Sequence, residues 1–177
     1  MPESKVLLDA VAVQRVLARM AHEIAERNDN SSQVVLVGIQ RGGIYLAQRL
    51  ADLLQGVWGH PVPVGHIDVC MHRDDLDQHL APPVHPTAIP CDVTGKTVVL
   101  VDDVLFRGRT TRAALDALND LGRPRAVQLA VLIDRGHREL PIKADFVGRN
   151  VPTSLRERIN VQLQEEGGED GVFLEHL

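Results

Sequence analysis

Aromatic residues are scarce in this chain of 177 residues, which contains one Trp, one Tyr and three Phe. So few rings argue against a platform that stacks the bases of a single-stranded nucleic acid. The two cysteines, Cys70 and Cys91, lack the spacing of a metal site or a redox pair, so we expect reduced thiols. No long apolar run and no signal peptide are apparent, and we expect a cytoplasmic protein that does not enter a membrane.

Two common nucleotide-binding patterns are also missing from the sequence. It contains neither Gly-x-x-x-x-Gly-Lys-Ser/Thr, the phosphate loop of many ATPases, nor Gly-x-Gly-x-x-Gly, the fingerprint of dinucleotide-binding folds. The length predicts a single domain, 1–177, that is large enough to bury a hydrophobic core.

The most informative segment that is present is Val98–Thr110. Its first four residues, Val98–Val101, are all apolar, which predicts a strand buried on both faces of a parallel sheet. Asp102 and Asp103 follow, then a loop at 104–109, and beyond the loop the apolar residues recur with a helical period. The loop therefore joins the carboxyl end of a strand to a helix, which is where open α/β sheets bind ligands.

This corner offers chemistry that suits a phosphorylated sugar. The first N–H groups of a helix favour a phosphate, and Gly108 lets the backbone approach it closely. Thr110 would donate a hydroxyl or cap the helix. Asp102 and Asp103 suit a vicinal diol, and both reach one sugar only if the strand has already ended, because adjacent strand residues face opposite sides. Together these groups suggest a ribose 5-phosphate; the alternative is an acidic pair used for capping and packing.

The order of the expected elements predicts a doubly wound, mostly parallel α/β sheet flanked by helices. Apolar runs place the strands at 34–37, 67–71, 98–101, 126–133, 146–147, 159–163 and, as an edge strand, near Phe173. A first helix is capped by Asp9, and a second follows the strand at 34–37. Their inward-facing residues are expected to be Val13, Leu17, Met20 and Ile24 in the first, and Ile44, Ala47, Ala51 and Leu54 in the second.

The informative segment resembles a known motif. Val98–Thr110 resembles the phosphoribosyl pyrophosphate (PRPP) motif of type I phosphoribosyltransferases. Together with Asp134-Arg135-Gly136-His137-Arg138-Glu139-Leu140-Pro141 and Asn150-Val151-Pro152-Thr153-Ser154, it resembles the bacterial PyrR family of pyrimidine operon attenuation regulators, over residues from about 6 to 165. The resemblance implies a type I phosphoribosyltransferase-like fold and uracil phosphoribosyltransferase activity, which converts uracil and PRPP to UMP and pyrophosphate with Mg²⁺.

The same resemblance implies roles for individual residues. Asp102 and Asp103, with Mg²⁺ bound directly or through water, and Arg73 would be catalytic. Uracil would bind near Asp134, Arg135 and Ile159. PRPP and nucleotides would contact Gln40, Arg41, Val98, Val99, Leu100, Val101, Asp102, Asp103, Val104, Leu105, Phe106, Arg107, Gly108, Arg109 and Thr110.

The sequence departs from the family pattern at two places. The run Gly38-Ile39-Gln40-Arg41-Gly42-Gly43 resembles the pyrophosphate loop, but the family has Arg-Gly at 42–43, whereas this chain has Arg41 and Gly42. The guanidinium is therefore either supplied one position earlier or lost. The PRPP motif normally has Thr where this chain has Arg107, which either adds a phosphate contact or crowds the site. Both departures bear on catalytic efficiency more than on nucleotide binding.

Residues 73–95 contain four prolines and no helical or strand period. A loop of this length inside a compact domain is usually functional or disordered, and in the family it forms a mobile hood over the active site. Transfer at the anomeric carbon passes through an oxocarbenium-like state that water would intercept, so a closing hood has a physical purpose. Arg73 at its base would neutralise pyrophosphate; the alternative is a surface salt bridge.

Basic residues are concentrated in one segment. Residues 107–149 carry nine Lys or Arg and five Asp or Glu, although the net charge of the chain is −5. Such a segment is compatible with a specific RNA partner or with a solvated surface. By the resemblance, UMP or UTP would favour a form that binds the leader RNA of pyrimidine operons. The candidates for RNA contact are Arg15, Arg19, His22, Arg27, Arg138, Lys143 and Arg149.

Two expectations concern assembly and the alternative function. The family forms dimers and larger assemblies, so a homodimer or higher homo-oligomer is expected. The alternative is a purine-type phosphoribosyltransferase, a salvage enzyme without RNA regulation. The segment Arg-Gly-His-Arg-Glu-Leu-Pro at 135–141 favours the pyrimidine regulator.

Overall fold

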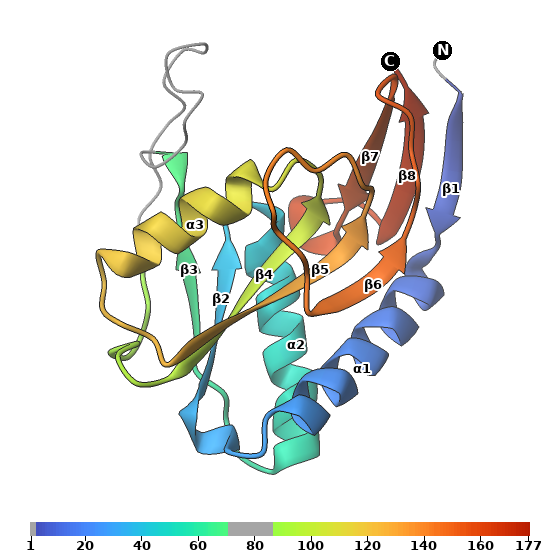
Figure 1. The fold of residues 1–177 in the computed structure, drawn as a ribbon. Coiled ribbons are helices and arrows are strands. Elements are labelled where there is room, and N and C mark those ends of the chain that lie inside the picture. The colour runs from blue at the N-terminus through green and yellow to red at the C-terminus, as the bar shows by residue number, and fades with distance from the viewer. Residues whose placement is uncertain (1–2, 71–86) are drawn as a thin grey trace.

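The main sheet has five parallel strands in the order β3-β2-β4-β5-β6 (Figure 1). The computed structural model describes residues 3–70 and 87–177. The strands are β2 (Val34–Ile39), β3 (Val64–Ile67), β4 (Thr97–Leu105), β5 (Ala126–Asp134) and β6 (Phe146–Asn150). One face is covered by α1 (Ala10–Arg27) and α2 (Gly42–Trp58), and the other by α3 (Arg109–Asn119). The predicted doubly wound α/β fold is confirmed.

A small antiparallel sheet lies beside the carboxyl ends of β5 and β6 (Figure 1). Its strands are β1 (Ser4–Leu8), β8 (Gly171–His176) and β7 (Glu157–Gln162). Because β8 pairs with β1 on one side and β7 on the other, the predicted edge strand near Phe173 is in fact central. The sequence did not predict β1, in which Val6 is 57% exposed and only the last residue is buried.

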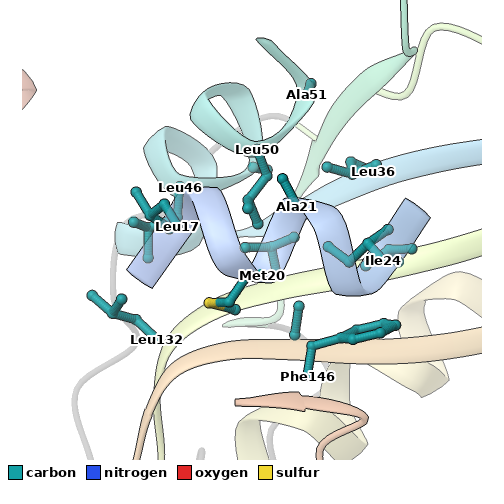
Figure 2. Close-up of a cluster of buried hydrophobic side chains, with 14 of the residues drawn as sticks. Leu17, Met20, Ala21, Ile24, Leu36, Leu46, Leu50, Ala51, Leu132 and Phe146 are labelled. Carbon is teal, nitrogen blue, oxygen red and sulfur yellow. The ribbon is translucent and has the colours of Figure 1, made fainter. Parts of the chain in front are cut away.

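The larger core lies between the sheet and the first two helices (Figure 2). Leu17, Met20 and Ile24 of α1 are buried, as their spacing predicted, against Leu46 and Leu50 of α2. Each such fully buried side chain contributes about 1.5–3 kcal/mol through removal from water. The cap of α1 is also as predicted, since the Asp9 carboxylate accepts a hydrogen bond from the N–H of Ala12 at 2.8 Å.

Several predictions about burial and boundaries are corrected. The side chain of Ile44 on α2 was expected to face inward but is only half-buried. The strand expected at 67–71 is β3, which ends at Ile67; Val69 is buried beyond it, and Met71 lies outside the described residues. The cap of α3 is Gly108, so Thr110 is inside the helix and does not cap it.

The most consequential correction concerns β4. The strand was expected to end at Val101, but it continues through both aspartates to Leu105, with Asp102 paired to Val131 of β5. Both aspartates therefore lie within the strand, and the condition under which both would reach one sugar, that the strand ends before them, is not met. The two carboxylates consequently have different surroundings.

Candidate functional site

The site lies where the strand order changes direction. The chain leaves β2 toward β3 on one side of the sheet and leaves β4 toward β5 on the other, and β2 and β4 are neighbours. The loop at 40–42 and the loop at 106–108 therefore follow neighbouring strands at the same edge of the sheet. Ligands of doubly wound folds bind at such switch points.

The loop after β2 approaches β4 very closely. A Cβ added at Gly42 would lie 2.6 Å from Oδ2 of Asp103, and one added at Gly43 would lie 2.1 Å from the carbonyl oxygen of Val101. Glycine is therefore required at position 43, where the obstacle is backbone, whereas at position 42 the Asp103 side chain would have to move. The departure from the family pattern at position 42 thus coincides with direct contact between the loop and an acidic side chain.

Polar groups of this loop remain available to a ligand. The side chain of Arg41 is 75% exposed, with its Nε 3.8 Å from Oε1 of Glu166. The peptide bond between Gln40 and Arg41 is cis. Among the described residues, Oε1 of Gln40 is buried without a hydrogen-bond partner. A buried amide oxygen without a donor suits a hydroxyl group or a hydrated cation.

The two aspartates have distinct partners. Asp102 is buried, its Oδ1 accepts the N–H of Asp103 at 2.8 Å, and it lines the cavity formed by the loop after β4. Asp103 is half-buried, faces Gly42, and its Oδ1 accepts the N–H of Val104 at 2.7 Å. Burial raises the pKa of Asp102 well above its ordinary value, and the adjacent charge of Asp103 raises it further.

Replacing Asp102 by Asn is therefore expected to stabilise the free protein at neutral pH, by roughly 1 kcal/mol or more, the scale of an unpaired buried charge. Because the folded state holds this proton more tightly than the unfolded state, stability falls as pH rises from about 4 through the raised pKa. The variant lacks this loss. Urea unfolding of both proteins between pH 4.5 and 8 should show a difference that grows with pH; a constant difference contradicts the assignment.

The loop after β4 forms a cradle at the start of α3. Gly108 occupies the N-cap position with φ of 90°, so no side chain of its own blocks the first N–H groups of the helix. A Cβ at this position would meet Cγ1 of Ile142 at 3.1 Å, in a backbone conformation that side chains rarely adopt. The loop encloses a cavity of about 180 Å³, lined by Asp102, Val104, Leu105, Phe106, Arg107, Gly108, Arg109, Thr110 and Thr111. Uncapped N–H groups facing a cavity form an anion site.

Arg107 does not fill this cradle. Its side chain is 53% exposed, and its guanidinium lies over the ring of Phe106 at 4.9 Å from the centroid. Glu139 lies close to it, with Oε1 at 3.7 Å from Nε of Arg107 and at 3.1 Å from Nε of Arg109. The two arginines on either side of Gly108 thus share one carboxylate.

A larger cavity, of about 420 Å³, opens beside the carboxyl ends of β5 and β6. Asp134, one of the residues predicted to bind uracil, lines it and pairs with Arg138 at 2.5 Å. Residues 150–153 form another part of its wall; this segment resembles the family, but no residue in it was predicted to bind uracil. The full lining is Asp134, Arg135, Gly136, His137, Arg138, Asn150, Val151, Pro152 and Thr153.

Arg135 also lines this cavity, but its guanidinium is mostly committed to the protein. It is 6% exposed and donates to Thr153 Oγ1 at 2.9 Å, to the carbonyl of Ser154 at 3.1 Å and to that of Glu157 at 2.9 Å. Its guanidinium also lies 3.9 Å from the ring centroid of Phe106. Arg135 therefore fixes the wall of the cavity.

One other predicted site residue is placed elsewhere, and another lies outside the described residues. Ile159 of β7 is buried in the larger core and does not line the cavity at Asp134. Arg73 and most of the predicted hood, 73–95, lie outside the described residues. The end of that segment is fixed to the body, since Thr87 accepts the N–H of Asp68 at 3.0 Å and Val93 is buried.

The predicted RNA-contacting residues fall into two groups. Arg15, Arg19, His22 and Arg27 are exposed on α1, which lies beside β6 (Figure 1). Arg19 donates to the carbonyls of Val147 and Gly148 on β6, Arg27 pairs with Asp145, and Arg149 donates to the carbonyl of Leu7. Arg15, Arg19, His22, Arg27 and Arg149 make a basic seam along α1 and β6. Lys143 is also exposed but lies outside this seam, since it lines a cavity with Thr111 and Leu115 of α3.

Arg138 belongs to neither α1 nor this seam. Its guanidinium donates to the carbonyls of Phe106 and Ile142, both at 2.9 Å, as well as to Asp134. It joins the loop after β4 to the loop after β5. The structure thus places Arg138 between the two cavities.

Comparisons with known proteins agree on a family and a fold. The phosphoribosyl transferase domain matches residues 4–163. The chain is 58% identical to the bifunctional protein PyrR of Streptomyces coelicolor, over 97% of this chain and 90% of that protein. It is 60% identical to the bifunctional protein PyrR of Roseiflexus sp., over 96% of this chain and 94% of that protein.

Solved structures support the fold. The hypoxanthine phosphoribosyltransferase of Trypanosoma cruzi superposes with a TM-score of 0.75 at 17% identity, covering 97% of this chain and 96% of that one. A hypoxanthine-guanine phosphoribosyltransferase of Bacillus anthracis gives 0.72 at 19% identity, covering 99% of each chain. No helix in the described part of the chain is long and apolar enough to cross a membrane.

Proposed function

The chain belongs to the bifunctional PyrR family, and we propose that the loops following β2 and β4 bind the substrates of its transferase reaction while the basic seam binds RNA. The protein is a pyrimidine attenuation regulator with uracil phosphoribosyltransferase activity. The observation that carries the residue assignment is the contact between Asp103 and Gly42, which brings the two predicted phosphate loops to one place.

PRPP would lie across the two loops. The N–H groups at the start of α3 would hold its 5-phosphate beside Gly108, and the loop at Gln40 and Arg41 would hold pyrophosphate. Asp103, which faces Gly42, would accept hydrogen bonds from the ribose hydroxyls, whereas Asp102 lines the cavity beside Gly108. The anomeric carbon would then lie between the loops, with Arg73 as a further predicted pyrophosphate ligand.

The residues fit Mg²⁺ only together with a substrate. The described residues contain no group of three or more His, Cys, Asp or Glu placed to hold a metal ion. Asp102, Asp103 and Oε1 of Gln40 supply oxygen donors, the kind that Mg²⁺ prefers beside phosphates and water. Mg²⁺ bound there would neutralise the charge of the leaving pyrophosphate.

In the transfer, N1 of uracil bonds to the anomeric carbon as the bond from that carbon to pyrophosphate breaks, and the N1 proton is released. Asp103 would stabilise the positive charge that develops on the sugar. Asp134 and the wall held by Arg135 would orient the base. The hood would exclude water from the oxocarbenium-like state.

One paired experiment tests this function. UMP formation is measured from uracil and PRPP, and binding to the pyrimidine leader RNA of the source organism is measured with and without UMP or UTP. We expect both UMP formation and an RNA affinity that increases with the nucleotide. Nucleotide formation from guanine or hypoxanthine, without RNA binding, would instead support the purine salvage enzyme. Sedimentation of the same sample tests the expected homodimer or higher homo-oligomer.

Replacing Arg19 by Gln is expected to weaken leader-RNA binding about 10-fold and to lower its salt dependence by about one ion, with UMP formation unchanged. Arg19 lies where α1 meets β6, and its side chain is 47% exposed. Arg158→Gln removes the same charge from β7, where Arg158 pairs with Glu175, and serves as the control. Equal RNA affinity of the two variants would show that the seam is not the RNA face.

A further inference from the structure

We infer that Glu139 and Glu166 set the affinities of the two phosphate loops separately, each by holding an arginine that would otherwise meet the phosphate of a ligand. The inference rests on the proposed function, which places the 5-phosphate at Gly108 and pyrophosphate at Arg41. Neither glutamate lines the 180 Å³ cavity itself, so each would act through an arginine.

Glu139 lies against both arginines of the 5-phosphate loop. Its Oε1 is 3.1 Å from Nε of Arg109 and 3.7 Å from Nε of Arg107, and these residues flank Gly108. The backbone N–H of Glu139 donates to the carbonyl of Arg107 at 3.0 Å, which keeps residue 139 in place whatever its side chain. A phosphate at the start of α3 would meet the same guanidinium groups that this carboxylate now neutralises.

Glu166 has the corresponding position at the other loop. Its Oε1 lies 3.8 Å from Nε of Arg41, and it belongs to the 3-10 turn Gln164–Glu166. Arg49 anchors this turn from α2, with hydrogen bonds of 2.6–2.8 Å to Glu165 and Asp170. The turn therefore stays in place when the Glu166 side chain is changed.

The energies indicate that the two glutamates compete with a bound phosphate for the arginines and contribute little to the stability of the fold. The pairs are partly exposed, with exposed fractions of 44% for Glu139 and 30% for Glu166, and such pairs contribute about 0–1 kcal/mol to stability. A phosphate dianion at an ionic contact with the same arginine interacts more strongly than one carboxylate. The carboxylate then remains as a nearby like charge that opposes binding. Its removal is expected to raise affinity for the ligand without unfolding the protein.

The two sites make different predictions for different ligands. UMP carries a 5-phosphate and no pyrophosphate, so its affinity should depend on Glu139 and not on Glu166. Pyrophosphate alone should show the opposite dependence. Uridine carries neither group and should respond to neither change.

The test compares wild type, Glu139→Gln and Glu166→Gln by isothermal titration with UMP, uridine and magnesium pyrophosphate. Glu139→Gln is expected to lower the Kd of UMP about 3- to 10-fold, and Glu166→Gln to lower that of pyrophosphate by a similar factor. Each variant is the charge-matched control for the other. Raising the salt to about 0.5 M should shrink both effects, because exposed charges are then screened within a few ångströms.

The outcomes distinguish a failure of this inference from a failure of the proposed function on which it rests. If wild type binds UMP no better than uridine, the proposed 5-phosphate site is wrong. If wild type binds UMP well but Glu139→Gln binds it equally or more weakly, Glu139 positions the arginines or does nothing, and the inference is overturned. Equal shifts for UMP in both variants would show a general charge effect and would also overturn it.

Discussion

Replacing Asp103 by Asn is expected to lower kcat/KM for UMP formation about 100-fold, which corresponds to about 2.7 kcal/mol of transition-state stabilisation. Asp103 lies where the two phosphate loops meet, with Oδ2 directed at Gly42. In the proposed mechanism the negative charge of Asp103 stabilises the positive charge that develops on the ribose, and the neutral amide of Asn cannot do so. The measurement is the initial rate at varied PRPP and Mg²⁺ concentrations.

The fold should tolerate this change. Oδ1 of Asp103 accepts the N–H of Val104, and the amide oxygen of Asn can accept the same hydrogen bond. The free energy of unfolding is therefore expected to change by less than about 1 kcal/mol. Asp52→Asn, on the exposed side of α2, removes the same charge away from the two phosphate loops and is the control. A rate within threefold of wild type would mean that Asp103 only organises the two loops.

The sequence predicted the elements whose burial follows a simple period. α1 was predicted because its apolar residues recur on one face, and β2 and β5 because their residues are almost continuously apolar. The small sheet was not predicted as a unit. Its strand β1 pairs with residues 172–175, far away in the sequence, and exposed Val6 gives no sign of that partner. Short half-exposed strands depend on tertiary pairing that local pattern does not contain.

The candidate site shows the same division. Gly108 and the acidic pair could be found because the chemistry of a strand–loop–helix corner is local. The continuation of β4 through Asp102 could not be predicted, because aspartate is rare in strands and the strand is extended by pairing with Val131 of β5. Arg135 and Arg138 line the cavity at Asp134, but the hydrogen bonds that they donate to the carbonyls of Ser154 and Phe106 could not be predicted, because only the folded chain brings these loops together.

Replacing Gly43 by Ala is expected to destabilise the protein by about 3 kcal/mol. The added Cβ would lie 2.1 Å from the carbonyl oxygen of Val101 and 3.2 Å from Cα of Asp102, and both are backbone atoms of the central strand β4. The start of α2 must then move away from β4, and the contact between Gly42 and Asp103 is lost with it. The free energy of unfolding is measured by urea titration.

Gly56→Ala is the matched control in the same helix. Nothing lies within 4 Å of a Cβ at this position, and alanine favours a helix over glycine, so this variant should be more stable by about 0.5–1 kcal/mol. The opposite signs of two identical substitutions in α2 would show that the distance between the helix start and β4 decides the result. A cost below about 1 kcal/mol for Gly43→Ala would mean that α2 can shift freely there. The two phosphate loops would then have no fixed separation, and a mechanism that depends on PRPP spanning them would lose its structural basis.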